Sequence, residues 1–190
     1  MSLDKKNICI IGLGYVGLPL AVAFAKKFKV VGFDIDKSRV KDLKDGNDKT
    51  LEVKRVFLDS VKPNITYTSN IKDTKKCNIY IVTVPTPIDK ANRPNLDPLI
   101  KASLMIGSIL KKDDIVIYES TVYPGVTRDI CVPVLTKSSG LVFNEDFFCG
   151  YSPERINPGD KKNTLSSVKK IISASNKKTL SKISKLYNTI

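Results

Sequence analysis

The chain has 190 residues, of which 42% are apolar, and it carries a formal net charge of +13 with no histidine. This length and apolar content predict one domain of ordinary size with a packed core. No apolar stretch approaches the ~20 residues that a membrane-spanning helix needs, so we expect a soluble, cytoplasmic protein without a membrane partner. Because histidine is absent, acid–base chemistry would fall to Glu, Asp, Lys, Tyr or Cys side chains.

Cysteine spacing and lysine distribution argue against a metal centre and a nucleic-acid partner. The four cysteines form no C-x-x-C pair, which favours reduced, mostly buried thiols over a metal site or disulfides. Many lysines fall in the last 30 residues, which contain no Asp or Glu. The same stretch has a single aromatic residue and no arginine, so a solvated lysine-rich face is favoured over a nucleic-acid patch.

The first predicted unit is a buried strand, a glycine-rich turn and a helix. An apolar run over 7–12 stops at Gly12, and Gly14 and Gly17 complete the pattern G-x-G-x-x-G as a helical pattern over 15–27 begins. Such glycines allow a tight turn, a close approach of a pyrophosphate to the backbone and close packing of the helix on the strand. The helix N-terminus would then face the pyrophosphate. The expected dinucleotide contacts in this loop are Gly12, Gly14, Tyr15, Val16 and Gly17.

The second predicted strand, over 29–34, ends in Asp34. An acidic residue there is typical of NAD binding, because its carboxylate accepts hydrogen bonds from the adenosine ribose and would repel the 2′-phosphate of NADP. A helix is expected over 36–45, and Asp34 could instead cap it, a role for which Asp36 is equally suited. Arg39 has two interpretations, a surface charge or a contact with the adenosine ribose or a phosphate.

The rest of the chain continues to alternate strands and helices. Further strands are expected over 64–68, 78–84, 114–119, 146–151 and 168–174. Further helices are expected over 51–60, 95–111, 124–137 and 177–189. The strands are mostly continuous apolar runs, which favours a parallel sheet covered on both faces. The sequence therefore predicts an α/β fold, a Rossmann-like doubly wound parallel sheet, as a single domain over residues 1–190.

Three short motifs follow the fourth, fifth and sixth predicted strands. They are V-P-T-P at 84–87, E-S-T-V-Y-P-G at 119–125 and Y-S-P-E-R-I-N-P-G at 151–159. Because ligands bind outside the carboxyl ends of parallel strands, we expect these motifs to line the cleft for a nicotinamide and a substrate. The candidate cofactor contacts on this side are Val84, Pro85, Thr86 and Thr121.

Together, the glycine motif, Asp34 and the three strand-end motifs closely resemble the UDP-glucose/GDP-mannose dehydrogenase family. The segment S-P-E-R-I-N-P-G-D at 152–160 is similar to the branch that oxidises UDP-N-acetylhexosamines. The resemblance covers essentially the whole chain but only the first of the family's three domains. It implies NAD as cofactor, a UDP-sugar substrate whose C6 alcohol is oxidised to a carboxylate with two NAD+, and a step in polysaccharide biosynthesis.

The resemblance also implies catalytic roles. In the family a cysteine captures the aldehyde stage and the resulting thioester is hydrolysed. Thr121 would position substrate or water near the reacting carbon, and Glu154 would assist the hydrolysis. The position of a second glutamate found in other branches is Pro158 here, so its role does not transfer.

Other parts of the family's machinery have no counterpart in the chain: the nucleophilic cysteine, the catalytic lysine and asparagine, and the UDP-binding domain. We therefore expect the chain to be truncated before the central and UDP-binding domains. The longer protein is expected to be a homodimer, and the chain alone to bind NAD without turning over UDP-sugars.

Two functions of other classes remain open from the residues. An S-adenosylmethionine-dependent methyltransferase also has a glycine loop and an acid after its second strand, although the two-residue spacing between Gly14 and Gly17 disfavours it. A non-enzymatic module, basic at its C-terminus, could hold nucleic acid or a partner. Individual residues also have plainer interpretations, with Thr86 and Thr121 as turn or strand-end hydroxyls and Glu154 in an ion pair with Arg155 or Lys161.

Overall fold

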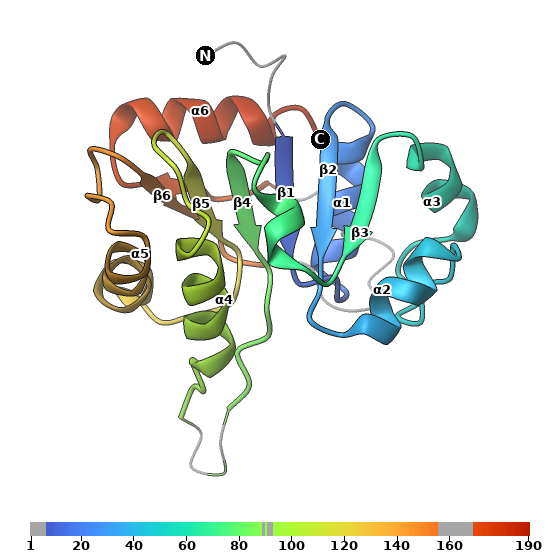
Figure 1. The fold of residues 1–190 in the computed structure, drawn as a ribbon, viewed down its shortest axis with the longest axis horizontal. Helices are drawn as coiled ribbons and strands as arrows, with labels where there is room; N and C mark the ends of the chain where they lie inside the picture. Colours follow the sequence, from blue (N-terminus) through green and yellow to red (C-terminus); the bar gives the residue numbers. More distant parts are fainter. Residues whose placement is uncertain (1–6, 89, 91–92, 156–168) are drawn as a thin grey trace.

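Seven strands form one sheet in the order β3-β2-β1-β4-β5-β6-β7 (Figure 1). The computed structural model describes residues 7–88, 90, 93–155 and 169–190. The strands are β1 (Asn7–Ile11), β2 (Lys29–Phe33), β3 (Ile65–Thr68), β4 (Ile79–Val82), β5 (Ile115–Tyr118), β6 (Phe148–Tyr151) and β7 (Ser173–Ala174). The helices are α1 (Gly17–Ala25), α2 (Lys37–Lys44), α3 (Arg55–Val61), α4 (Asp97–Gly107), α5 (Val132–Ser139) and α6 (Lys177–Tyr187).

The strand order reverses between β1 and β4. From β1 the chain adds β2 and then β3 on one side, and it returns to add β4, β5 and β6 on the other, all of them parallel. β1 therefore lies between β2 and β4, with Cys9 opposite both Val31 and Tyr80. Such a reversal opens a crevice at the carboxyl ends of the strands, where doubly wound sheets bind their ligands.

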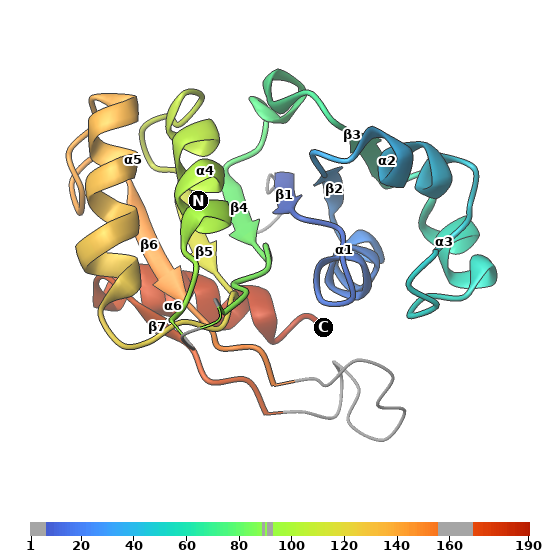
Figure 2. The same ribbon diagram turned by 90° about the horizontal axis from the view of Figure 1, so that it is seen from below.

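Successive residues of the central strands face opposite sides of the sheet and build two cores. Ile8 and Ile10 of β1 pack with residues of α1 and α6, whereas Cys9 and Ile11 pack with residues of α4 and α5. Figure 2 shows the resulting layers, with α4 and α5 over one face of the sheet and α1 and α6 over the other. Burial on both faces explains why these strands are continuous apolar runs, and it confirms the predicted doubly wound α/β fold.

Three details differ from the prediction. β7 runs antiparallel to β6, and within the described residues it is only Ser173–Ala174 rather than the full run over 168–174. α3 begins at Arg55 rather than at 51, because Leu51 has a φ of 58°, which lies outside helical geometry. α1 begins at Gly17, two residues inside the expected helix. In the part of the chain that the structure describes, no helix has the length and apolarity to cross a bilayer.

Candidate functional site

The glycine turn after β1 is locked by contacts that leave no room for side chains at two of its three glycines. Gly12 has a φ of 95°, and its carbonyl accepts a hydrogen bond of 2.8 Å from Thr83 Oγ1. A Cβ built on Gly17 would lie 1.9 Å from that same carbonyl oxygen. A Cβ on Gly14 would meet nothing within 4 Å, so open space faces the backbone there. That space suits a pyrophosphate, which must approach the main chain closely.

The backbone N–H groups at the N-terminus of α1 have no side-chain cap, whereas those at the N-terminus of α2 are capped by a side chain of the protein. α1 has no acidic residue in its first turn and no side-chain cap at Val16. At α2, Asp36 caps the helix by accepting from the N–H groups of Ser38 and Arg39. The positive end of the α1 dipole is therefore left for an anion.

Asp34 lies just past the end of β2 and faces the glycine turn. Its Oδ2 accepts from Leu13 N at 2.8 Å, and its Oδ1 accepts from Asp36 N at 2.9 Å. Asp36 caps α2, so the alternative interpretation of Asp34 as the cap of this helix is wrong. A carboxylate oxygen can accept more than one hydrogen bond, so Asp34 keeps capacity for ribose hydroxyls.

Arg39 is buried, so its interpretation as a surface charge is wrong. Its side chain reaches back from α2, and its Nε and Nη2 donate to Leu13 O at 2.9 and 2.8 Å. Its Nη1 lies 2.7 Å from Oδ1 of Asp48, whose side chain is 1% exposed. Burial alone would raise the pKa of Asp48, but hydrogen bonds from Thr50, Val53 and Arg39 outweigh it and lower that pKa. Arg39 thus braces the glycine turn, and a direct contact with the cofactor stays a prediction.

An apolar pocket of about 620 Å³ opens between the glycine turn and α4. It brings together four residues predicted to bind the cofactor, namely Gly12, Asp34, Val84 and Pro85. Further walls come from Phe33, Ile35, Ala102, Leu104 and Met105. Apolar walls with a carboxylate at the rim fit an adenosine, whose base is flat and apolar on both faces and whose ribose carries hydroxyls. The described residues on this side of the cleft therefore fit NAD.

Hydrogen bonds join the ends of β4 and β5 on the other side of the cleft. Thr86 Oγ1 donates to Thr121 O at 2.6 Å, and Ser120 Oγ donates to Val84 O at 2.5 Å. The structure thus brings the V-P-T-P segment and the Thr121 turn together, as expected for motifs at neighbouring strand ends. The Thr121 side chain is exposed. A second pocket of about 570 Å³ lies alongside, lined by 122–125 and other residues.

Glu154 follows β6 and is half-buried. Its Oε1 accepts from the backbone N–H of Arg155 at 2.8 Å. Lys161, the other cation considered for it, and the motif positions 156–160 lie outside the described residues. The proposed role of Glu154 in hydrolysis stays a prediction.

Glu119, the first residue of the E-S-T-V-Y-P-G motif, is a buried acid at the end of β5 for which the sequence predicts no role of its own. Glu119 is 1% exposed, and it forms an ion pair with Lys170 and accepts a hydrogen bond from Tyr187 Oη. Burial raises the pKa of Glu119, Lys170 lowers it, and the negative charge of Glu154 raises it, with a net rise. The one available signal was an acid directly after an apolar strand, since its partners lie 51 and 68 residues away.

All four cysteines are free and buried, as predicted. Burial raises the pKa of Cys131 to about 11, and it also raises that of Cys149. None of these thiols lines the cleft pockets described above. In the described ranges, no three His, Cys, Asp or Glu side chains group in a way that could hold a metal ion.

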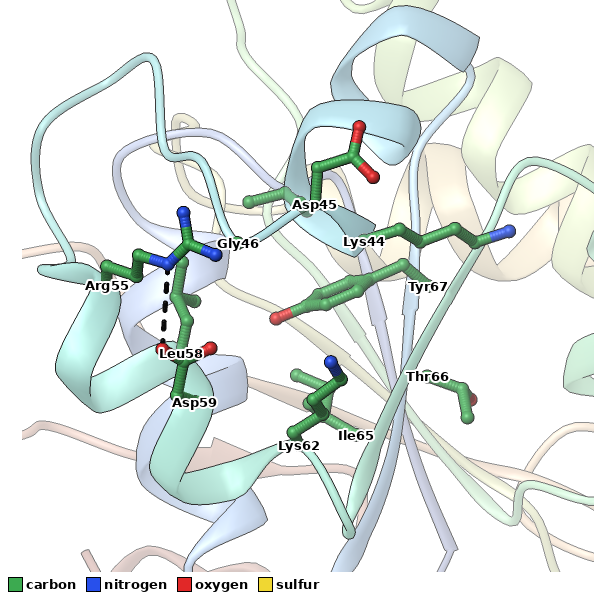
Figure 3. Close-up of a pocket in the computed structure, with 11 residues that line it drawn as sticks. Lys44, Asp45, Gly46, Arg55, Leu58, Asp59, Lys62, Ile65, Thr66 and Tyr67 are labelled. Atoms are coloured by element: carbon green, nitrogen blue, oxygen red, sulfur yellow. Dashed lines mark ion pairs between the residues drawn. The ribbon is translucent and has the colours of Figure 1, made fainter.

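A further hollow of about 430 Å³ lies at the edge of the molecule, between α2, α3 and β3 (Figure 3). Its rim carries Lys44, Arg55 and Lys62, and Arg55 pairs loosely with Asp59 at 3.6 Å. No residue of the glycine turn or of the ends of β4, β5 and β6 contributes to it. This hollow is separate from the cleft.

The glycine turn, the uncapped N-terminus of α1 and the apolar pocket beside Asp34 at the switch point define a dinucleotide-binding domain of the dehydrogenase type. The family described as "UDP-glucose/GDP-mannose dehydrogenase family, NAD binding domain" matches residues 6–190. The chain belongs to this family, as its NAD-binding domain, and NAD is its cofactor.

Known proteins of this family cover nearly the whole chain. It is 57% identical over 97% of its length to a UDP-N-acetyl-D-glucosamine 6-dehydrogenase of Pseudomonas aeruginosa, and 53% identical over 100% of its length to one of Salmonella typhi. A solved UDP-D-ManNAc dehydrogenase of Pyrococcus horikoshii is 31% identical and superposes on 97% of the chain with a TM-score of 0.89. The chain covers only 43%, 44% and 44% of these three proteins. Neither a methyltransferase nor a basic binding module finds support in these similarities.

Proposed function

We propose that this domain serves a UDP-N-acetylhexosamine 6-dehydrogenase, which oxidises the C6 alcohol of the sugar to a carboxylate with two NAD+. The observation that carries the proposal is the 57% identity, over 97% of the chain, to an enzyme named for UDP-N-acetyl-D-glucosamine. What supports it in the structure is that Thr121 and Glu154 follow the neighbouring strands β5 and β6, at the same edge of the sheet as the glycine turn.

The residues of the first half of the cleft would hold the cofactor. The α1 N-terminus and the space at Gly14 would take the pyrophosphate, the carboxylate of Asp34 the ribose, and the apolar pocket the adenine. When bound, NAD+ supplies the acceptor for the hydride that leaves the sugar. Asp34 would favour NAD over NADP, because its charge repels a 2′-phosphate.

The second half of the cleft would contribute the groups that act on the sugar. Thr121 would position the substrate or a water, and Glu154 would take a proton from the water that hydrolyses the thioester. A carboxylate fits this role because the chain has no histidine to serve as base. The four cysteines are buried. We therefore expect the thiol that forms the thioester to come from outside residues 1–190.

The remaining expectations concern the longer protein and its surroundings. We expect central and UDP-binding domains beyond this one, because the curated relatives are more than twice as long as the part that the chain matches. We also expect a cytoplasmic homodimer that has a UDP-sugar as substrate and neither nucleic acid nor membrane as partner.

A domain exchange tests the proposal directly. Residues 6–190 would replace the matching segment of the P. aeruginosa relative, and NADH formation from NAD+ and UDP-N-acetylglucosamine would be followed by absorbance. We expect turnover by the chimera and none by the chain alone, which lacks the thiol and the UDP-binding surface. A chimera that binds NADH tightly and still fails to oxidise any UDP-N-acetylhexosamine would overturn the proposal.

The same chimera tests Glu154. Glu154→Gln keeps size and hydrogen-bonding reach but cannot accept a proton, so a covalent acyl-enzyme should accumulate and be visible by intact mass spectrometry. Glu145→Gln, at an exposed glutamate before β6, is the matched control and should behave as the parent. Parent-like turnover without an adduct in Glu154→Gln would remove Glu154 from the mechanism.

A further inference from the structure

The buried group Glu119, Lys170 and Tyr187 is built around the residue that directly follows β5, at the carboxyl edge of the sheet, and has no part in the function proposed above. The side chain of Glu119 is 0% exposed and that of Lys170 13%. One carboxylate oxygen of Glu119 accepts from Lys170 Nζ and the other from Tyr187 Oη. An ionised pair that is this far out of water is costly, so its place in the fold calls for a reason beyond stability.

The group ties together elements that are far apart in the sequence. Glu119 follows β5, Lys170 precedes β7, and Tyr187 ends α6. The Lys170 ammonium also lies 5.2 Å from the centroid of the Tyr187 ring, which packs edge-to-face on Phe24 of α1. Glu119 is thereby held from two sides, through one hydrogen bond and one ion pair.

Glu119 directly precedes the turn that carries Thr121. Its backbone N–H donates to Val82 O at 2.8 Å, and the next two residues bond to the V-P-T-P segment through Ser120 Oγ and Thr121 O. Fixing Glu119 therefore fixes both segments that form the far side of the cleft. The adenosine pocket extends from Asp34, after β2, to Val84 and Pro85, after β4. A dinucleotide whose ribose lies at Asp34 and which extends across the switch point would place its nicotinamide beyond this pocket, toward the ends of β5 and β6.

The charges around Glu119 should affect the binding of NAD+ and of NADH differently. The nicotinamide ring carries a positive charge in NAD+ and none in NADH. Three ionisable groups interact with Glu119, namely Lys170, Tyr187 and Glu154. Lys170 alone would repel the oxidised ring, but the carboxylate of Glu119 cancels its charge within the same buried group.

We infer that Glu119 is a positioning residue for the nicotinamide end, which fixes the Thr121 turn and neutralises Lys170, and so keeps the domain selective for oxidised NAD+. The inference rests on NAD binding by this domain. It concerns the relative affinity for the two forms of the cofactor, which the adenosine half cannot distinguish.

The test is the ratio of the dissociation constants for NAD+ and NADH, measured by calorimetry on the 190-residue chain at pH 8.5. Glu119→Gln keeps an acceptor for Tyr187 but leaves Lys170 uncompensated, so this ratio should rise about 3- to 15-fold, as expected for one unit charge at ~10 Å. Lys170→Met should lower the ratio. The double variant should restore it. If part of a variant is unfolded, the apparent affinities for NAD+ and NADH fall by the same factor, so their ratio does not change.

Asp114→Asn is the matched control. Asp114 is also buried, precedes the same strand and pairs with Lys111 at 3.1 Å, but it lies at the opposite end of β5. In Asp114→Asn, the ratio of the dissociation constants for NAD+ and NADH should equal that of the parent. An unchanged ratio in both single variants, or an equal change in Asp114→Asn, would overturn the inference. A parent chain that binds neither form would overturn NAD binding as well, and so is distinguished from these outcomes.

Discussion

The two halves of the cleft are built in different ways. On the β2 side, Asp34 and Arg39 both bond to Leu13 of the glycine turn, and Asp34 lines the apolar pocket together with residues after β4 and of α4. On the β5–β6 side, Thr121 is exposed, and its carbonyl accepts a single exposed hydrogen bond from Thr86 Oγ1. We therefore expect the β2 half to contribute most of the cofactor affinity of this domain and the β5–β6 half to contribute less.

The difference also sets how each half should respond to substitution. The β2 half is braced by buried charge and by backbone contacts, so single changes there should cost stability or cofactor affinity. Apart from the buried ion pair of Glu119, the β5–β6 half is joined by single hydrogen bonds from Thr86 and Ser120, so changes at these two residues should leave the fold nearly intact. The following substitutions are ordered from the largest expected effect to the smallest.

Arg39→Met should have the largest effect, because it removes the brace of the glycine turn and leaves Asp48 buried without its cation. Breaking a buried pair by removing one partner costs about 3–5 kcal/mol, which urea unfolding would measure. Arg55→Met is the matched control. Its pair with Asp59 is exposed, and its loss should cost less than ~0.5 kcal/mol (Figure 3). Equal stability of the two variants would contradict a stabilising role for the contacts of Arg39 with Leu13 and Asp48.

The parent should also lose stability on acidification through Asp48. Its folded-state pKa is lowered, so the stabilisation is present above the unfolded-state pKa of about 3.9 and is lost as the pH falls through the lower folded value. Urea unfolding between pH 6 and pH 3 should show a steeper loss in the parent than in Arg39→Met. Parallel curves would show that Asp48 carries no such linkage.

Gly17→Ala and Gly14→Ala separate the fold from the ligand site. The Gly17 methyl would meet the Gly12 carbonyl, a backbone group that cannot move aside cheaply, so unfolding free energy should fall by about 1–3 kcal/mol. The Gly14 methyl points into open space and should leave stability within ~0.5 kcal/mol of the parent while weakening NADH binding. If Gly14→Ala binds NADH as tightly as the parent, the pyrophosphate does not bind beside Gly14.

Asp34→Ala should weaken NADH binding by about 1–3 kcal/mol, the cost of losing hydrogen bonds to a charged group. It should also narrow the preference for NADH over NADPH, because the charge that repels a 2′-phosphate is gone. Fluorescence titration with both cofactors measures this. Asp36→Ala, which removes the α2 cap but no ribose contact, should leave the preference unchanged. NADPH binding by the parent as tight as NADH binding would refute the role of Asp34.

The features that could be predicted from the sequence are those that depend on residues close together in the chain. The glycine motif, its strand and Asp34 were predictable because turn geometry and strand ends depend on a few neighbouring residues. The brace from Arg39 to Leu13 spans 26 residues, and its target is a backbone carbonyl, which no residue pattern marks. The ion pair of Glu119 spans 51 residues. Nothing near either partner indicates the other, so only the fold could reveal the pair.

Thr86→Val should have the smallest effect and tests the β5–β6 half alone. It removes the hydrogen bond from Thr86 Oγ1 to Thr121 O while keeping the side-chain shape, and because this bond is exposed to water the loss should be about 0.5 kcal/mol of unfolding free energy. Because the bond lies on the far side of the cleft from Asp34, NADH affinity should fall less than in Asp34→Ala. Thr66→Val, at an exposed position on β3, is the control for the exchange itself. Should Thr86→Val weaken NADH binding as much as Asp34→Ala, the two halves would be coupled rather than separately built.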